Sequence, residues 1–224
     1  MKKLLITFAI LGLALSVNAQ ERREKQDVPP ARTQEVQTIR LANELARFGY
    51  ENASAMALIQ AAEMLASVST QPLTHESKEQ GRGEASAQKD EKPAFSPQTL
   101  IADAKRIAAG NQNLIALADN VRIDNATRGR VGGPGVITTI VQARATDTYT
   151  ISFRAGHVAE ILVVGDGDTD LDLFVYDSNG NLIVFDDDYT DVCYVRWTPR
   201  WTGPFTVKVV NLGRVWNQYT LTTN

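Results

Sequence analysis

Aspartate is the residue type in this sequence whose spacing best suits a chemical role. Two short segments, residues 166–172 and 186–191, are dense in aspartates. Calcium binds about six to eight oxygen atoms, and closely spaced carboxylates on neighbouring loops can supply them. An EF-hand is excluded because Leu171 occupies the position of its glycine. We therefore expect a calcium site that joins the two loops, with ligands drawn from Asp166, Asp168, Asp170, Asp186, Asp187 and Asp188.

The same aspartates have a second interpretation, which stays open at this point. Aspartate favours turns because its side chain hydrogen-bonds nearby backbone, and exposed aspartates help to keep a sandwich domain soluble. In a chain with many predicted turns, these roles account for aspartates without any metal.

Aromatic residues near the C-terminus suggest a different binding site. Tyr189, Trp201 and Trp216 fall in or near predicted loops, where they could stack on sugars or on peptide side chains. The alternative is that they pack under the loops, since large aromatic side chains are usually mostly buried. Trp197 alternates in phase with Cys193 and is predicted to lie in the core.

The sequence gives little support for catalysis. It contains two histidines, His75 in a predicted linker and His157 in a predicted turn, and neither position suits a Ser-His-Asp or Cys-His site. The zinc-protease, α/β-hydrolase and phosphate-loop motifs are absent. Cys193 is interpreted as a small buried residue. We expect a non-enzymatic protein, with a hydrolase that uses an unrecognised site as the remote alternative.

The first 19 residues have the composition of a signal peptide. Lys2 and Lys3 precede an apolar run over residues 4–17, and cleavage is expected between Ala19 and Gln20. The run is shorter than the ~20 residues of a bilayer-spanning helix, so no membrane span is expected after cleavage. The net charge of −3 argues against nucleic acid as a partner. We expect an exported protein that is periplasmic, on the cell surface or secreted.

Helical spacing begins after the charged segment 20–32, which is predicted to be disordered. A helical hairpin is predicted over residues 33–68, with Gly49 ending its first helix and Asn52 capping its second. Its apolar stripe is predicted to contain Leu41, Leu45, Phe48, Met56 and Ile59.

A second helical pair is predicted over residues 96–122. Ser96 and Pro97 have the order of a cap followed by the first helical residue, and Gly110-Asn111 separates two helical stretches. Residues 69–95, which are polar and charged, are interpreted as a flexible linker between the two pairs. The glycine-rich segment 123–135 is predicted to be a hinge.

From residue 136 to residue 224 the pattern changes to two-residue alternation. Tyr149, Ile151 and Phe153 alternate with polar residues, which is typical of a half-buried strand. About eight short strands with turn signals between them predict an antiparallel β-sandwich. The expected fold class is therefore α+β in separate segments, with N-terminal helical hairpins followed by a jelly-roll-like sandwich.

Several motifs in this region resemble the bacterial pre-peptidase C-terminal domain. They are DTDLDLFVYD (168–177), NGNL (179–182), DDD (186–188) and TGPFTVKV (202–209). The resemblance covers residues 137–224, does not extend to the helical region, and implies a jelly-roll-like module of exported proteins. It also implies roles in calcium binding, in attachment to substrate or matrix, and in secretion or processing.

These observations predict a non-enzymatic exported protein with a binding or attachment module that calcium stabilises. The expected partner is an extracellular or periplasmic protein or a polysaccharide. The alternative is an accessory or chaperone-like partner of a secreted enzyme, in which the helical pairs bind that enzyme.

Overall fold

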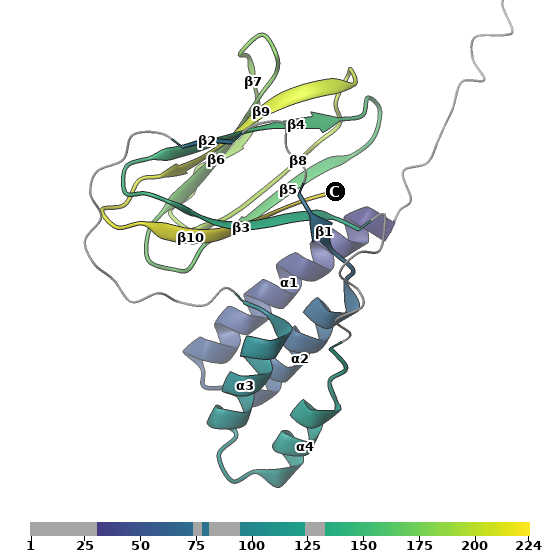
Figure 1. The fold of residues 1–224 in the computed structure, drawn as a ribbon, viewed down its shortest axis with the longest axis vertical. Helices are drawn as coiled ribbons and strands as arrows, with labels where there is room; N and C mark the ends of the chain where they lie inside the picture. Colours follow the sequence, from purple (N-terminus) through teal and green to yellow (C-terminus); the bar gives the residue numbers. More distant parts are fainter. Residues whose placement is uncertain (1–30, 74–77, 81–94, 124–132) are drawn as a thin grey trace, which may run out of the picture.

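A computed structural model describes residues 31–73, 78–80, 95–123 and 133–224. Within these residues, four helices in the N-terminal half and an antiparallel β-sandwich confirm the predicted fold class (Figure 1). The predicted signal peptide, residues 1–19, and most of the predicted linker and hinge lie outside the described residues. Within the described ranges, no helix has both the length and the apolar composition of a membrane span.

The helices begin at residues whose side chains cap them. They are α1 (Ala31–Glu51), α2 (Ala55–Ser67), α3 (Pro97–Ile107) and α4 (Gln112–Asn120). The side chains of Ser54, Ser96 and Asn111 accept backbone N–H groups in the first turns of α2, α3 and α4. The predicted start of α3 is therefore confirmed, and Gly110-Asn111 separates α3 from α4 as predicted.

The first hairpin differs from its prediction at the turn. Gly49 does not end α1, which continues through Glu51, and Ser54 rather than Asn52 is the cap of α2. Gly49 instead lies where α1 meets α2. A Cβ atom at this position would lie 2.5 Å from Cδ2 of Leu58, so the glycine permits close contact between the helices.

The buried face of α1 also differs from the predicted stripe. Leu41 and Phe48 are 54% and 52% exposed, and Met56 of α2 is 50% exposed. The fully buried positions of α1 include Val36 and Ala46. Small residues let the helices approach closely, so the packed face follows alanines rather than the largest apolar side chains.

The sandwich consists of two five-stranded sheets. Sheet A has the order β1-β3-β10-β5-β8, and sheet B has the order β2-β4-β9-β6-β7. All neighbours are antiparallel except β1 and β3. The strands of sheet A are β1 (Gln71–Pro72), β3 (Gly135–Val141), β5 (Ala159–Val164), β8 (Val192–Trp197) and β10 (Asn217–Thr223). The strands of sheet B are β2 (Lys78–Gln80), β4 (Thr146–Phe153), β6 (Leu171–Tyr176), β7 (Leu182–Asp186) and β9 (Gly203–Asn211).

Side chains that alternate along the strands fill the space between the sheets, as predicted. Tyr149, Ile151 and Phe153 of β4 are buried in this core. Trp197 packs against the same core and meets Phe153 edge-on, with ring centroids 4.8 Å apart, which confirms its predicted place.

Two short strands lie inside the segment predicted to be a linker, residues 69–95. Gln71 pairs in parallel with Gly135, and Lys78 pairs with Tyr149 in the antiparallel sense. These strands extend the edges of the two sheets through backbone hydrogen bonds, which need no apolar side chain. Composition alone therefore does not reveal them, and the linker interpretation is wrong for these residues.

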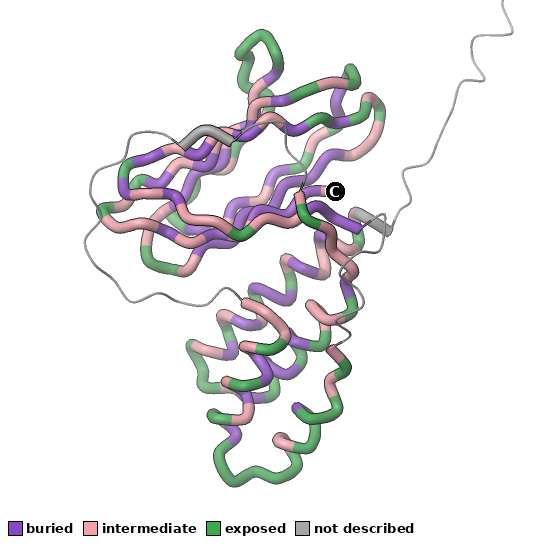
Figure 2. The backbone as a smooth tube through the Cα atoms, in the orientation of Figure 1, coloured by how far each residue is buried: buried purple, intermediate pink, exposed green. Residues whose placement is uncertain are grey.

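The helices lie against the outer face of sheet A (Figure 1). Val36 and Ile39 of α1 form a buried cluster with Leu162 and Val164 of β5. The inward residues of β5 belong to the core between the sheets, so both faces of this strand are covered. Figure 2 shows that the buried residues lie along the strands of the sandwich and where the helices face one another.

Candidate functional site

The two aspartate-rich loops lie against each other at one end of the sandwich. We call them the acidic loops: residues 165–170 connect β5 to β6, and residues 187–191 connect β7 to β8. The backbone N–H of Gly165 donates to the carbonyl of Asp191 over 2.8 Å, and that of Leu171 donates to the carbonyl of Thr190 over 3.0 Å. Both loops cross between sheets A and B, which places their carboxylates close together.

Several of the predicted calcium ligands hold the backbone in place. Asp166 accepts the backbone N–H of Gln218 over 2.9 Å, and Asp186 accepts that of Tyr194 over 2.8 Å. The carboxylate of Asp188 accepts both the backbone N–H and the hydroxyl of Thr190. Asp168 donates its own N–H to Asp166 over 3.3 Å. The carboxylates of Asp166, Asp186 and Asp188 therefore have a structural role, because each accepts a backbone N–H group.

Asp170 and Asp172 have a different environment. Oδ1 of Asp170 is buried and accepts no hydrogen bond from the described residues. Burial, followed by the charges of Asp188 and Asp191, raises the pKa of Asp170. Burial and four neighbouring carboxylates, that of Asp170 foremost, raise the pKa of Asp172 to about 6. Asp172 is 7% exposed, so water screens this repulsion poorly.

This charge arrangement suits a cation, although the carboxylates do not converge on one point. Among the described residues, no group of three or more His, Cys, Asp or Glu side chains is arranged to hold a metal ion. Asp170 and Asp172 fit a cation by their charge, and Oδ1 of Asp170 also accepts no hydrogen bond from the described residues. A closed coordination shell would require the carboxylates of the acidic loops to move together.

One basic side chain already reaches the acidic loops, and it comes from the helices. Nη2 of Arg47 on α1 lies 2.7 Å from Oδ1 of Asp191, which is 4% exposed. The same nitrogen donates to the carbonyl of Gly165 over 3.1 Å. Arg47 therefore neutralises Asp191 and fixes α1 to both acidic loops, a role that its place in a helical pattern does not reveal.

The aromatic residues predicted to bind ligands do not form one site. Tyr189 is 97% exposed in an acidic loop, and Trp216 precedes β10 at the same end of the sandwich. Trp201 precedes β9 at the opposite end, where its ring stacks on Phe205 with centroids 5.6 Å apart. A common platform of the three residues is therefore not present.

A different set of aromatic side chains does lie together, on the outer face of sheet B. Phe174 of β6 pairs with Phe185 of β7, and their rings are 6.1 Å apart at an interplanar angle of 17°. Tyr176 is the next outward residue of β6, with its ring 6.5 Å from that of Phe174. Nζ of Lys208 lies 5.1 Å from the centroid of the Tyr176 ring. We call Phe174, Tyr176 and Phe185 the aromatic surface.

Sequence analysis did not identify the aromatic surface. Phe174 and Tyr176 alternate with the core residues Leu173 and Val175, so they occupy outward positions of a correctly predicted strand. The sequence signal for this surface is the presence of aromatic residues at positions of the strand that point away from the core. Phe185 is 50% exposed, and Figure 2 shows much of the hairpin around β7 in the exposed class.

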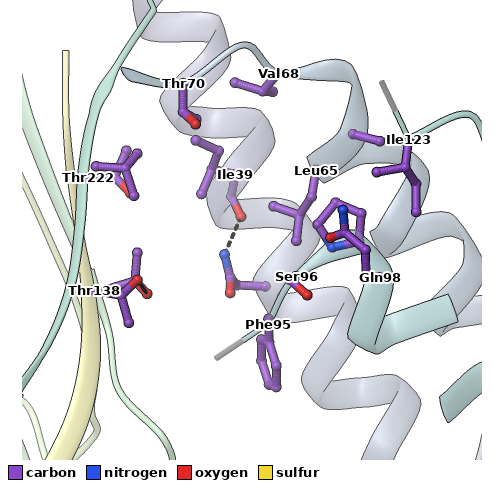
Figure 3. A pocket seen from close by; sticks show the side chains of 15 residues that line it. Ile39, Leu65, Val68, Thr70, Phe95, Ser96, Gln98, Ile123, Thr138 and Thr222 are labelled. Atoms are coloured by element: carbon purple, nitrogen blue, oxygen red, sulfur yellow. Dashed lines mark hydrogen bonds between the residues drawn. The ribbon is translucent and has the colours of Figure 1, made fainter. Parts of the chain in front are cut away.

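A pocket of about 280 Å³ lies between the helices and the outer face of sheet A (Figure 3). Threonines of β3 and β10 form the sheet side, and the hydroxyls of Thr138 and Thr220 are 2.9 Å apart. Ile39, Leu65 and Phe95 belong to the helical side. The pocket thus has a hydroxyl-rich wall on the sheet side. Its helical side combines apolar residues with the polar Asn43, Ser96 and Gln98.

The residues considered for catalysis lie apart. His157 is in the turn between β4 and β5, at the end of the sandwich opposite the acidic loops. Cys193 is 1% exposed, and its thiol donates to the carbonyl of Leu171. Burial, followed by nearby aspartates, raises the pKa of this thiol and so opposes formation of a thiolate. His75 lies outside the described residues.

Comparisons with known proteins show only remote similarity. No protein-family model and no curated protein sequence matches the chain. The pre-peptidase C-terminal domain of a Bacillus anthracis collagenase is 13% identical, with a TM-score of 0.34 over 41% of this chain and 89% of that one.

Two further solved structures have a comparable degree of similarity. PliG of Aeromonas hydrophila, a periplasmic inhibitor of g-type lysozyme, is 13% identical, with a TM-score of 0.33 over 41% of this chain and 84% of that one. A carbohydrate-binding module of Cellvibrio mixtus lichenase 5A, in complex with cellotriose, is 11% identical, with a TM-score of 0.27 over 41% and 86%. No family model supports the sequence resemblance to the pre-peptidase C-terminal domain.

Proposed function

We propose that this is a non-enzymatic exported protein that attaches to a neutral polysaccharide through the aromatic surface of its sandwich. The observation that supports it is the row of Phe174, Tyr176 and Phe185 on a sheet face that the helices leave open. Export rests on the predicted signal peptide, residues 1–19, and leads to the periplasm, the cell surface or the exterior.

The arrangement of the rings suits a chain of sugar units. A sugar ring has an apolar face of C–H groups, which stacks on an aromatic ring while its hydroxyls project sideways. The rings of Phe174 and Phe185 are nearly parallel, and half of Phe185 is exposed. Their nearly rigid rings lose little conformational entropy on binding. Lys208, beside Tyr176, is placed to hydrogen-bond a sugar hydroxyl.

The surrounding charge favours a neutral polymer over an acidic one. Asp172 lies on the same face of β6 as Phe174, since residues two apart point the same way. The carboxylates of Asp186 and Asp187 interact electrostatically with Asp172 and add negative charge at this end. An anionic polysaccharide would be repelled by this group.

The test is sedimentation of the full-length mature protein with insoluble cellulose, chitin and xylan. Phe174→Ala and Phe185→Ala are each expected to weaken retention by roughly tenfold, because each removes a central stacking ring. The matched control is Trp201→Ala, which removes a partly exposed ring that stacks on Phe205 and is not part of the aromatic surface. The proposal fails if none of the polymers retains the protein, or if both variants bind as well as the wild type.

We further propose that calcium stabilises the acidic loops, held by Asp170 and Asp172 with contributions from residues 186–188. The raised pKa values of Asp170 and Asp172 support this, because a bound cation would relieve the repulsion between them. Calcium would supply positive charge and a fixed loop conformation. Asp170→Asn should abolish any calcium-dependent rise in the thermal midpoint of the full-length protein, and identical midpoints in calcium and in chelator would refute the proposal.

A further inference from the structure

We propose that the pocket between the helices and sheet A binds one or two units of a neutral sugar. This site is separate from the aromatic surface, which lies on the outer face of the other sheet. It would give the protein a second, pocket-type recognition site, and it does not depend on attachment to a polymer.

The walls of the pocket are held in place by contacts between the helices and the sandwich. Nε2 of Gln37 donates to the hydroxyl of Tyr194 over 2.6 Å, and Arg47 pairs with Asp191. Val36 and Leu162 are fully buried in the apolar cluster beside these contacts. A pocket with fixed walls is preformed, so little conformational entropy is lost when a ligand enters.

The sheet side of the pocket offers groups that match sugar hydroxyls. Thr138 and Thr220 hydrogen-bond each other across β3 and β10, and Thr222 continues the row on β10. A threonine hydroxyl both donates and accepts, as a sugar hydroxyl does. From the helical side, Asn43 of α1 adds an amide group. It is 8% exposed, and its Nδ2 donates to the carbonyl of Ile39, so its amide orientation is fixed.

The helical side offers apolar groups to the other face of a sugar ring, with the polar side chains of Ser96 and Gln98 beside them. Ile39 and Leu65 lie on this side, and Phe95 adds an aromatic ring that itself stacks on Tyr50 at 5.6 Å. Figure 3 shows Thr138 and Thr222 on the strand side, with Ile39, Leu65 and Phe95 across the space from them. A molecule with one hydroxylated side and one apolar side fits both walls.

Charge and volume narrow the class of ligand. None of the described residues that line the pocket is charged, although charged residues make up 22% of the chain. A phosphate or carboxylate would therefore enter without a counter-charge, which is costly. The volume of about 280 Å³ is at the small end of ligand pockets, which limits the ligand to one or two sugar units.

The experiment is calorimetric titration of the full-length mature protein with glucose, N-acetylglucosamine, cellobiose and chitobiose, and with glucuronic acid as a charged comparison. We expect at least one neutral sugar to bind and glucuronic acid to bind more weakly. Thr138→Val and Thr220→Val keep the shape of the side chain and remove its hydroxyl. Each should weaken binding by about three- to tenfold.

Two further variants separate this proposal from attachment at the aromatic surface. Thr148→Val removes an outward hydroxyl from sheet B and should leave the affinity for the small sugar unchanged. Phe185→Ala should reduce retention by polymer and leave the same affinity unchanged. The pocket proposal is overturned if no neutral sugar binds, if glucuronic acid binds best, or if Phe185→Ala weakens binding while both threonine variants do not.

Discussion

The outer faces of the two sheets differ in whether helices cover them. That of sheet A is covered by α1, and its residues Leu162 and Val164 are part of a buried cluster. That of sheet B remains open in the described structure and displays Phe174 and Phe185. Apolar residues at outward positions therefore have two different roles in one sandwich. Those of sheet A form the contact between the sandwich and the helices, and those of sheet B form a surface that is available to a ligand.

The largest expected effect tests whether the covered face is part of the core. Leu162→Ala should lower the free energy of unfolding by about 3 kcal/mol, because the leucine is fully buried between β5 and α1. The matched variant Phe185→Ala should cost only about 1 kcal/mol, because half of this side chain is already exposed. Urea unfolding followed by circular dichroism measures both losses. Equal losses would show that the covered face of sheet A contributes no more to stability than the open face of sheet B.

A smaller effect is expected at the ion pair that links α1 to the acidic loops. Arg47→Ala should cost about 2 kcal/mol, because it leaves the carboxylate of Asp191 buried without its charged partner. Arg106→Ala is the control, since its pair with Asp103 is exposed within one helix and should contribute less than about 0.5 kcal/mol. Thermal unfolding in low and high salt measures both. A loss at Arg47 no greater than that at Arg106 would show that the acidic loops do not depend on α1.

The smallest expected effect concerns the dependence of stability on pH. Here the substitution is expected to raise stability, whereas the two preceding substitutions lower it. The pKa of Asp172 in the folded protein is about 6, above the ~4 of an unfolded aspartate. Between these values the folded state keeps a proton that the unfolded state has lost. The contribution of this group to stability therefore falls as the pH rises from about 4 to about 6, and it stays low above that.

Asp172→Asn should remove this pH dependence and raise the thermal midpoint at pH 7 in chelator by roughly 2–4 °C. Glu63→Gln, at an exposed position of α2, is the control and should leave the pH profile unchanged. A variant that melts at a lower temperature than the wild type at pH 7 would contradict the raised pKa.

Much of the sandwich could be predicted because alternation is a local property of the sequence. The core residues of β4 and the place of Trp197 follow from a period of two. The cap at Ser96 was equally local, since its side chain bonds the turn that follows it. The turn of the first hairpin failed, because Gly49 serves contact with α2 and not the end of α1.

What could not be predicted depends on contacts between distant segments. The exposure of Phe174 and Phe185 depends on which sheet the helices cover, and local spacing does not specify this. The position of Arg47 beside Asp191 joins residues from the two halves of the chain. The strands at Gln71 and Lys78 form through backbone pairing, which does not require a particular amino-acid composition.

The position of β10 has a consequence for the order of folding. This strand is the last of the sandwich in chain order, yet it lies in the middle of sheet A, between β3 and β5. β3 and β5 therefore have no common partner until Asn217–Thr223 are available. Sheet A cannot close progressively as the polypeptide emerges, so completion of the module is a late step that involves contacts between residues far apart in sequence.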